Sequence, residues 1–188
     1  MNGLTSGLCV IMAGILAFQS YLAGEFYMIA MFGLLAGATL GFWFFNFPKA
    51  SIFLGDSGST TLGFLFGALT TVSTYYESGM ASQLPILLPA IVMGVPLFDT
   101  VTVMWIRWRR GKPLMEGDTN HFSHRLVALG MSRTEAVVFI YGVALCVGLG
   151  AIVLRPLDWR YGVLQAAVIG LVFLGIYWME RVSRRREP

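Results

Sequence analysis

The sequence predicts an all-α protein, a polytopic transmembrane helical bundle of about six spans with both termini in the cytoplasm. The first observation is composition, because 56% of the 188 residues are hydrophobic and only 12% are charged, whereas soluble domains have about 25% charged residues. The second is that apolar residues form runs close to the roughly 20 residues that cross a bilayer. The third is that basic residues gather in alternate connections, which orients the chain.

Six apolar runs are predicted to be spans. In chain order they cover residues 6–23, 26–45, 60–76, 84–106, 134–154 and 161–180. The third is short and rich in Gly and Thr, and Pro96 is expected to bend the fourth because proline disrupts the preceding turn of a helix. No soluble domain interrupts these runs, so residues 1–188 are interpreted as one integral-membrane domain.

Basic residues set the orientation of the predicted bundle. They are concentrated in residues 107–133 and in the tail at 181–186, and loops rich in Lys and Arg stay in the cytoplasm. Counting spans then places the loops 45–59 and 107–133, with both termini, on the cytoplasmic face. The net charge of +3 is therefore attributed to these loops, and no nucleic-acid partner is expected.

A polar cluster, Gly55-Asp56-Ser57-Gly58-Ser59, lies in the first of these loops. One interpretation is a turn followed by a helix that Ser59 or Thr60 caps. A protease-like active serine is disfavoured, because such a serine needs a base and a buried acid placed around it by a folded scaffold. A third interpretation is a metal–phosphate site, in which Asp56 is a hard oxygen ligand for Mg²⁺ and the glycines let backbone N–H groups approach phosphate oxygens.

The second loop contains both histidines of the chain, His121 and His124. On a helix these two would share a face, with Arg125 one turn beyond His121, and Asp118 or Asn120 would cap that helix. A solvated amphipathic helix is one interpretation, and a zinc site is another that would need further ligands. A cluster of His and Arg is better suited to anionic phosphates, to which these side chains donate charge-assisted hydrogen bonds.

Asp99 lies inside the fourth predicted span. An acid at that depth is costly and indicates a functional site by default. The other interpretation is that Asp99 lies near the cytoplasmic end and pairs with a neighbouring helix or with Arg107. Both interpretations stay open on the sequence alone.

Together these stretches resemble the polyprenyl-phosphate N-acetylhexosamine-1-phosphate transferases, glycosyltransferase family 4. The family's loop, roughly N-x-x-P-A-x-x-F-x-G-D-x-G-S, is matched by residues 46–59, except that Lys49 stands between the proline and the alanine. Its later motif D-x-x-H-x-H-H-R-L is matched by residues 118–126, with Ser123 in place of the middle histidine. Residues 2–4 match the end of a third motif, so the chain resembles the C-terminal half of such an enzyme.

The resemblance implies transfer of N-acetylhexosamine-1-phosphate from a UDP-sugar to a polyprenyl phosphate such as undecaprenyl phosphate, with release of UMP. It implies Mg²⁺, or alternatively Mn²⁺, held by Asp56, and a multi-pass protein of the bacterial inner membrane whose active face is cytoplasmic and which forms a homodimer. The residues implied are Asp56, His121 and His124 for catalysis, Asn2, Gly55, Ser57, Gly58, Ser59, Asn120 and Arg125 for substrate binding, and Asp99 and Asp118 as further candidates.

The family also carries an Asp-Asp pair, assigned to catalysis, upstream of the stretch matched here. We therefore expect this polypeptide alone to be inactive. The alternative function is that of a truncated, non-catalytic membrane protein that binds a lipid phosphate or a partner.

Overall fold

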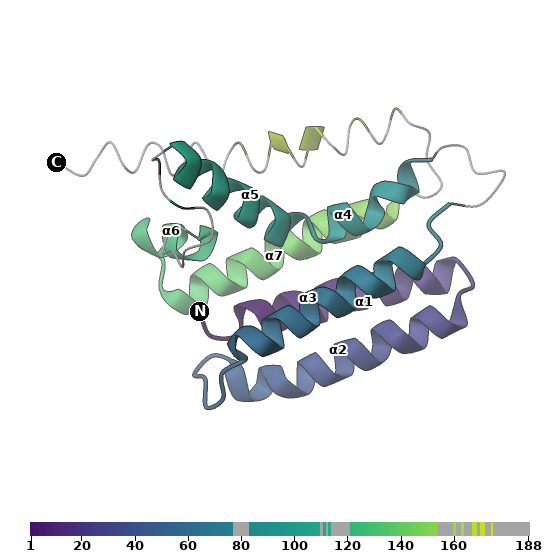
Figure 1. Cartoon of the computed structure of the whole chain (residues 1–188), viewed down its shortest axis with the longest axis horizontal. Helices are drawn as coiled ribbons and strands as arrows, with labels where there is room; N and C mark the ends of the chain where they lie inside the picture. The colour runs from purple at the N-terminus through teal and green to yellow at the C-terminus, as the bar shows by residue number, and fades with distance from the viewer. Residues whose placement is uncertain are drawn as a thin grey trace.

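The structure is a computed structural model that describes residues 1–76, 83–109, 111, 113 and 121–153, with seven isolated positions between 160 and 174. Every regular element within these residues is a helix, as the sequence predicts (Figure 1). In chain order the elements are α1 (Leu4–Leu22), α2 (Phe26–Asn46), α3 (Gly55–Val72), the 3-10 helix η1 (Leu84–Leu87), α4 (Leu88–Val92), α5 (Gly94–Arg109), α6 (Phe122–Ala128) and α7 (Arg133–Val153).

The helices form two groups that meet along α1 and α7. In Figure 1, α1, α2 and α3 run side by side as consecutive antiparallel helices, and α7 crosses between this group and the α4–α5 segment. The core lies between the groups, where Ala13 and Leu16 of α1, Phe32 of α2, and Ala136 and Ile140 of α7 are each at most 2% exposed. Burial of these apolar side chains is the main driving force for the packing.

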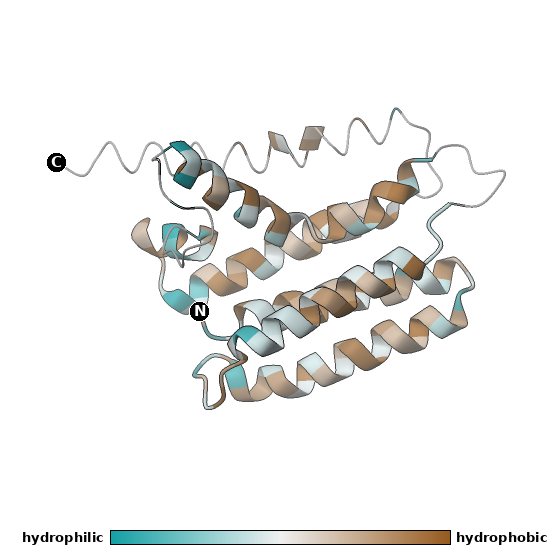
Figure 2. Ribbon diagram, viewed as in Figure 1, coloured by the Kyte–Doolittle hydropathy of each residue, from teal (hydrophilic) through white to brown (hydrophobic). Residues whose placement is uncertain are grey.

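Three helices, α1, α2 and α7, are long and apolar enough to cross a membrane. The bent pair formed by residues 84–92 and 94–109 would make a fourth if it is one span. Coloured by hydropathy, these helices consist mostly of apolar residues, and hydrophilic residues occur towards their ends (Figure 2). Helix α3, which matches the Gly- and Thr-rich third run, is not among the candidate spans, and the sixth predicted run lies mostly outside the described residues.

The fourth predicted span is not one continuous helix. It breaks at Met93, and its two parts are inclined by 70°. The prediction that Pro96 bends this span is therefore confirmed, and the break lies in the turn before the proline. A proline ring clashes with the carbonyl four residues earlier, here that of Val92, so α4 ends at Val92 and α5 begins at Gly94 with Pro96 in its first turn.

One end of the bundle carries most of the polar connections. The N-terminus, the loop after α2, the start of α3, the whole of α6 and the start of α7 lie together on the left of Figure 1. These are the parts of the chain that the sequence assigns to one face of the membrane. The candidate site residues therefore come from segments that are distant in sequence and gathered at one end of the fold.

Candidate functional site

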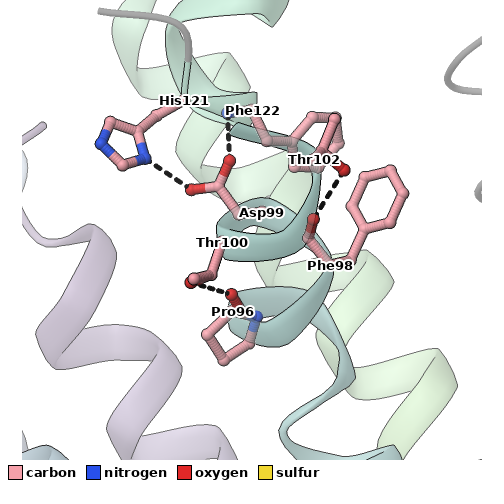
Figure 3. Close-up of polar contacts among 7 residues, drawn as sticks. All are labelled: Pro96, Phe98, Asp99, Thr100, Thr102, His121 and Phe122. Carbon is pink, nitrogen blue, oxygen red and sulfur yellow. Dashed lines mark hydrogen bonds and ion pairs between the residues drawn. The ribbon is translucent and has the colours of Figure 1, made fainter. Parts of the chain in front are cut away.

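Asp99 joins α5 to α6 (Figure 3). One oxygen of its carboxylate accepts a hydrogen bond from the backbone N–H of Phe122, with an N···O distance of 2.5 Å. The other lies 2.9 Å from Nδ1 of His121. The predicted pairing with a neighbouring helix is confirmed, and because His121 is itself a predicted site residue, this pairing also places Asp99 beside the candidate site.

Helix α6 begins later than the sequence indicates. His121 is its N-cap residue, with an extended backbone (φ −59°, ψ 148°), and Phe122 is the first helical residue. The prediction that His121 and His124 share one face of a helix is therefore wrong, since His121 lies just before it. The two predicted caps, Asp118 and Asn120, lie outside the described residues.

Unlike His121, which contacts Asp99, His124 lines a cavity. This cavity has a volume of about 400 Å³. Its described lining residues are Met1, Asn2, Phe47, Pro48, His124, Arg133 and Thr134. It brings together two predicted site residues, Asn2 and His124, which are more than 120 positions apart in the chain.

The electrostatics of the cavity are positive. Burial lowers the pKa of His124, and the nearby positive charges of the N-terminus, His121 and Arg133 lower it further, against an opposing effect of Asp99. None of the described residues that line the cavity is acidic. Among the described lining residues, an anion in this cavity would therefore meet cationic and neutral groups only.

Asn46 fixes the start of α1 against the loop after α2. Its side-chain oxygen accepts a hydrogen bond of 2.7 Å from the backbone N–H of Gly3, and its side-chain nitrogen donates one of 2.7 Å to the carbonyl of Ile52. Asn46 is only 7% exposed. The amide therefore satisfies two backbone groups at once and holds Asn2 at the edge of the cavity.

A second contact to the same segment comes from α7. The Tyr141 hydroxyl donates to the carbonyl of Gly3 and accepts a 3.0 Å hydrogen bond from Nε1 of Trp43. Sequence reasoning missed both Asn46 and Tyr141 as positioning residues. The signal for Asn46 was an amide at the end of an aromatic run, whereas nothing local to Tyr141 indicated its partners 98 and 138 positions away.

The Gly55–Ser59 cluster is the first part of α3 rather than a turn before it. Gly55 has a positive φ of 67°, a conformation that glycine adopts without strain, and the helix runs on from there. The predicted cap at Ser59 or Thr60 is therefore wrong, and the Ser59 hydroxyl donates to the carbonyl of Asp56 within the helix at 3.0 Å. Asp56 lies in the first turn with its side chain exposed.

Arg125 lies inside the fold rather than at the cavity. It is 7% exposed, and its guanidinium carbon lies 5.8 Å from the centre of the Phe122 ring. Ser123, at the position of the middle histidine in the resembled motif, is 3% exposed. Of the predicted residues, the structure thus joins Asp99 to His121 and Asn2 to His124, while Asp56, Ser57 and Gly58 stand at the start of α3.

A magnesium ion fits Asp56 only in combination with a substrate. No group of three or more His, Cys, Asp or Glu side chains that could hold a metal occurs among the described residues. Mg²⁺, however, is commonly held by one or two carboxylates together with substrate phosphates, and the exposed carboxylate of Asp56 is of this type. The donor set suits an ion shared with a phosphorylated ligand and does not form a closed protein cage.

Comparison with known proteins gives a family. Residues 1–74, which contain Asn2 and Asp56, match the model described as "Glycosyl transferase family 4". The chain is 34% identical over 155 residues to a Bacillus subtilis protein named probable undecaprenyl-phosphate N-acetylglucosaminyl 1-phosphate transferase. The chain belongs to glycosyl transferase family 4.

Two further relatives that carry similar names also match the chain. A decaprenyl-phosphate N-acetylglucosaminephosphotransferase of Mycolicibacterium smegmatis is 40% identical over 57% of the chain and 28% of the relative. An undecaprenyl-phosphate alpha-N-acetylglucosaminyl 1-phosphate transferase of Haemophilus influenzae is 27% identical over 74% of the chain and 41% of the relative. The match to the Bacillus subtilis protein covers 82% of the chain but 42% of that relative, so the chain spans less than half the length of these proteins. No solved structure matches the chain.

Proposed function

We propose that this family 4 chain takes part in transferring N-acetylhexosamine-1-phosphate from a UDP-sugar to a polyprenyl phosphate, with release of UMP. One observation carries the proposal. Asn2, which lies in the stretch matched by the family model, lines the same cavity as His124, and His121 of the Asp99–His121 pair precedes His124 in the same segment. The names of the relatives, which are N-acetylglucosamine-phosphate transferases acting on polyprenyl phosphates, support it. Synthesis of a cell-envelope polymer such as peptidoglycan or lipopolysaccharide would use such a product.

The reaction brings two anions together, because a lipid phosphate must attack the diphosphate of the sugar nucleotide. Cationic donors are needed where this charge accumulates. In the proposed site, His124 donates to a phosphate oxygen from the cavity wall, and His121 is held in place by the carboxylate of Asp99. Asn2 contributes an amide at the same cavity, where Asn46 holds its neighbour Gly3.

Asp56 is the proposed holder of Mg²⁺, with Mn²⁺ as an alternative. A divalent ion there would neutralise phosphate charge in the reacting complex. Ser57 and Gly58 line a second cavity of about 360 Å³ on the inner side of the α3 start. They are the proposed surroundings of the metal-bound phosphate, together with Gly55 and Ser59.

The proposed setting is the bacterial inner membrane, with the active end of the bundle in the cytoplasm. We propose the full six-span topology, both termini cytoplasmic, and a homodimer. The three to four candidate spans found in the described residues and the bacterial relatives support a membrane protein. Gathering of the polar connections at one end of the bundle supports a single active face.

The test is a transfer assay on membranes that contain the protein expressed from its complete reading frame, supplied with UDP-GlcNAc, undecaprenyl phosphate and Mg²⁺. We expect UMP release that EDTA abolishes and that Asp56→Asn lowers at least a hundredfold, a loss typical of a group that stabilises charge in the transition state. Glu25→Gln is the matched control, because it neutralises a carboxylate at the opposite end, where Glu25 accepts from the Thr74 N–H.

Full activity of Asp56→Asn would remove Asp56 from the site. The absence of any transfer by the unaltered protein would favour the alternative, a membrane protein that only binds lipid phosphate or a partner. No observation in the described residues favours that alternative, and the relatives are named as transferases.

A further inference from the structure

Arg133 is a cation at the cavity that neither the family motifs nor the predicted site includes. It lines the same cavity as Asn2 and His124. Its side chain is exposed, and within the part of the chain that the structure describes it makes no ion pair. A guanidinium that faces a cavity without an acidic partner is free to bind an anion.

The position of Arg133 is fixed by the local start of α7. Ser132 and Glu135 form a reciprocal pair in which the Ser132 N–H donates to the Glu135 carboxylate at 2.7 Å and the Glu135 N–H donates to the Ser132 hydroxyl at 3.2 Å. This is the capping-box arrangement that satisfies the first N–H groups of a helix. Arg133 is thereby the first residue of α7, and the acid nearest to it in sequence, Glu135, is engaged in backbone hydrogen bonding.

The two histidines have separate environments. His121 is directed to Asp99, so its Nδ1 is occupied by a carboxylate. His124 faces the cavity, and Arg133 is near enough to lower its pKa. Two basic side chains face one cavity whose described lining contains no acid, and this indicates that the cavity suits a negatively charged ligand.

The size and lining of the cavity fit a phosphorylated small molecule. Its volume of about 400 Å³ falls within the roughly 300–1,000 Å³ common for small-ligand sites. Phe47 and Pro48 supply apolar wall, and a planar guanidinium binds two phosphate oxygens at once. A lysine at this position would provide a single point charge and could not bind two phosphate oxygens in this planar, bidentate way.

We propose that Arg133 and His124 together bind one phosphate group in this cavity, as a subsite that rests on the proposed transfer reaction. The phosphate belongs either to the diphosphate of the sugar nucleotide or to the headgroup of the polyprenyl phosphate. Both sources present the same phosphate oxygens to the two side chains. Arg133 is a binding residue in this proposal, and no bond is made or broken by it.

The first experiment measures equilibrium binding of inorganic pyrophosphate to the purified full-length protein in detergent. We expect Arg133→Gln to weaken binding roughly tenfold, in line with the loss of a hydrogen bond to a charged group, and Arg133→Lys to restore part of it. Lys49→Gln is the matched control, because Lys49 is exposed in the loop beside Pro48 but does not line the cavity. An equal loss in Lys49→Gln would show a general charge effect and overturn the subsite.

A double-mutant cycle tests whether Arg133 and His124 hold the same phosphate. If they do, the loss of pyrophosphate binding in Arg133→Gln/His124→Gln will be smaller than the product of the two single losses, since residues that share a partner are not additive. Fully multiplicative losses would show independent sites and contradict the proposal. Circular dichroism of each variant confirms that the helices are retained.

Kinetics then identify the source of the phosphate. Arg133→Gln is expected to raise the KM for UDP-GlcNAc alone if the diphosphate occupies the subsite, and for undecaprenyl phosphate alone if the lipid does. Unchanged KM values for both substrates, with pyrophosphate binding also unchanged, would overturn the subsite while leaving the transfer reaction intact. If Arg133→Gln weakens pyrophosphate binding but the unaltered protein shows no transfer, the phosphate subsite is supported and the proposed function is contradicted.

Discussion

Oδ2 of Asp99 lies 2.9 Å from Nδ1 of His121, although the two residues are 22 positions apart in the chain. The same carboxylate accepts from the Phe122 N–H, so a single acid both orients a histidine and completes the start of α6. Because Asp99 lies on α5, just beyond the break between α4 and α5, the direction of α5 decides where His121 points. The position of the bend thereby affects the geometry of the candidate site.

The two contacts of Asp99 can be separated by substitution. Asp99→Asn keeps an oxygen for the Phe122 N–H but removes the charge that holds His121, whereas Asp99→Ala removes both. We expect transfer to fall at least tenfold in both variants, since an ionised hydrogen bond contributes roughly 1.5–3 kcal/mol. Hydrogen exchange at the Phe122 amide should increase only in Asp99→Ala.

Thr102→Val is the control for these variants. It lies on the same helix, and the Thr102 hydroxyl donates only to the carbonyl of Phe98, at 2.6 Å. It should leave transfer unchanged. Retention of full transfer by Asp99→Asn would show that the pair with His121 has only a structural role.

Asn46 is predicted to be required for stability as well as for the site. Asn46→Leu leaves the buried Gly3 N–H without its partner, which costs roughly 1–3 kcal/mol for an unsatisfied buried group, and also removes the part-buried bond to the Ile52 carbonyl. The thermal unfolding midpoint in detergent should therefore fall by several degrees. Ser51→Ala, which removes an exposed hydroxyl that donates to the Phe45 carbonyl, should change it little; equal effects would contradict the special role of Asn46.

The parts of the fold that the sequence predicts well are those set by local composition. Apolar runs placed α1, α2 and α7 within a few residues of their observed bounds, because length and hydrophobicity alone define such helices. The start of α3 was misplaced, since Gly55 can adopt a positive φ and begins the helix before the serines that were expected to cap it. A bend was predicted from Pro96, and the break at Met93 lies in the turn that this proline disrupts.

The candidate site was predictable only as a set of residue types. His124 and Asn2 were identified from their motifs, but their meeting at one cavity depends on the packing of α1 against α7. Asp99 was ambiguous for the same reason, because its partners are the N-cap and the first residue of α6. Arg133 carried no signal of its own, since a basic residue in a cytoplasmic loop is expected for orientation alone.

Close packing of α1 against α7 gives a test at Gly7. A methyl group added at this position would overlap with the hydroxyl and ring of Tyr141, whose hydroxyl donates to the Gly3 carbonyl. Gly7→Ala should therefore destabilise the protein by about 1–3 kcal/mol, the usual cost of overpacking, and lower transfer by displacing the start of α1. Gly14→Ala is the matched control, because nothing lies within 4 Å of the added methyl group, and it should be neutral or slightly stabilising.

The titration of His124 links the cavity to pH. Burial lowers its pKa below 6.5, with the positive charge of Arg133 among the further causes. The unfolded chain therefore binds a proton at His124 more readily than the folded chain. As pH falls from about 6.5 through the folded pKa, the contribution of His124 lowers the free energy of unfolding, and below the folded pKa this contribution is constant. NMR of labelled histidines, assigned with His124→Gln, should show a midpoint below 6.5 that rises in Arg133→Gln and on addition of pyrophosphate. A midpoint at or above 6.5 in the unliganded protein, or one that Arg133→Gln does not raise, would contradict the positive environment on which the phosphate subsite depends.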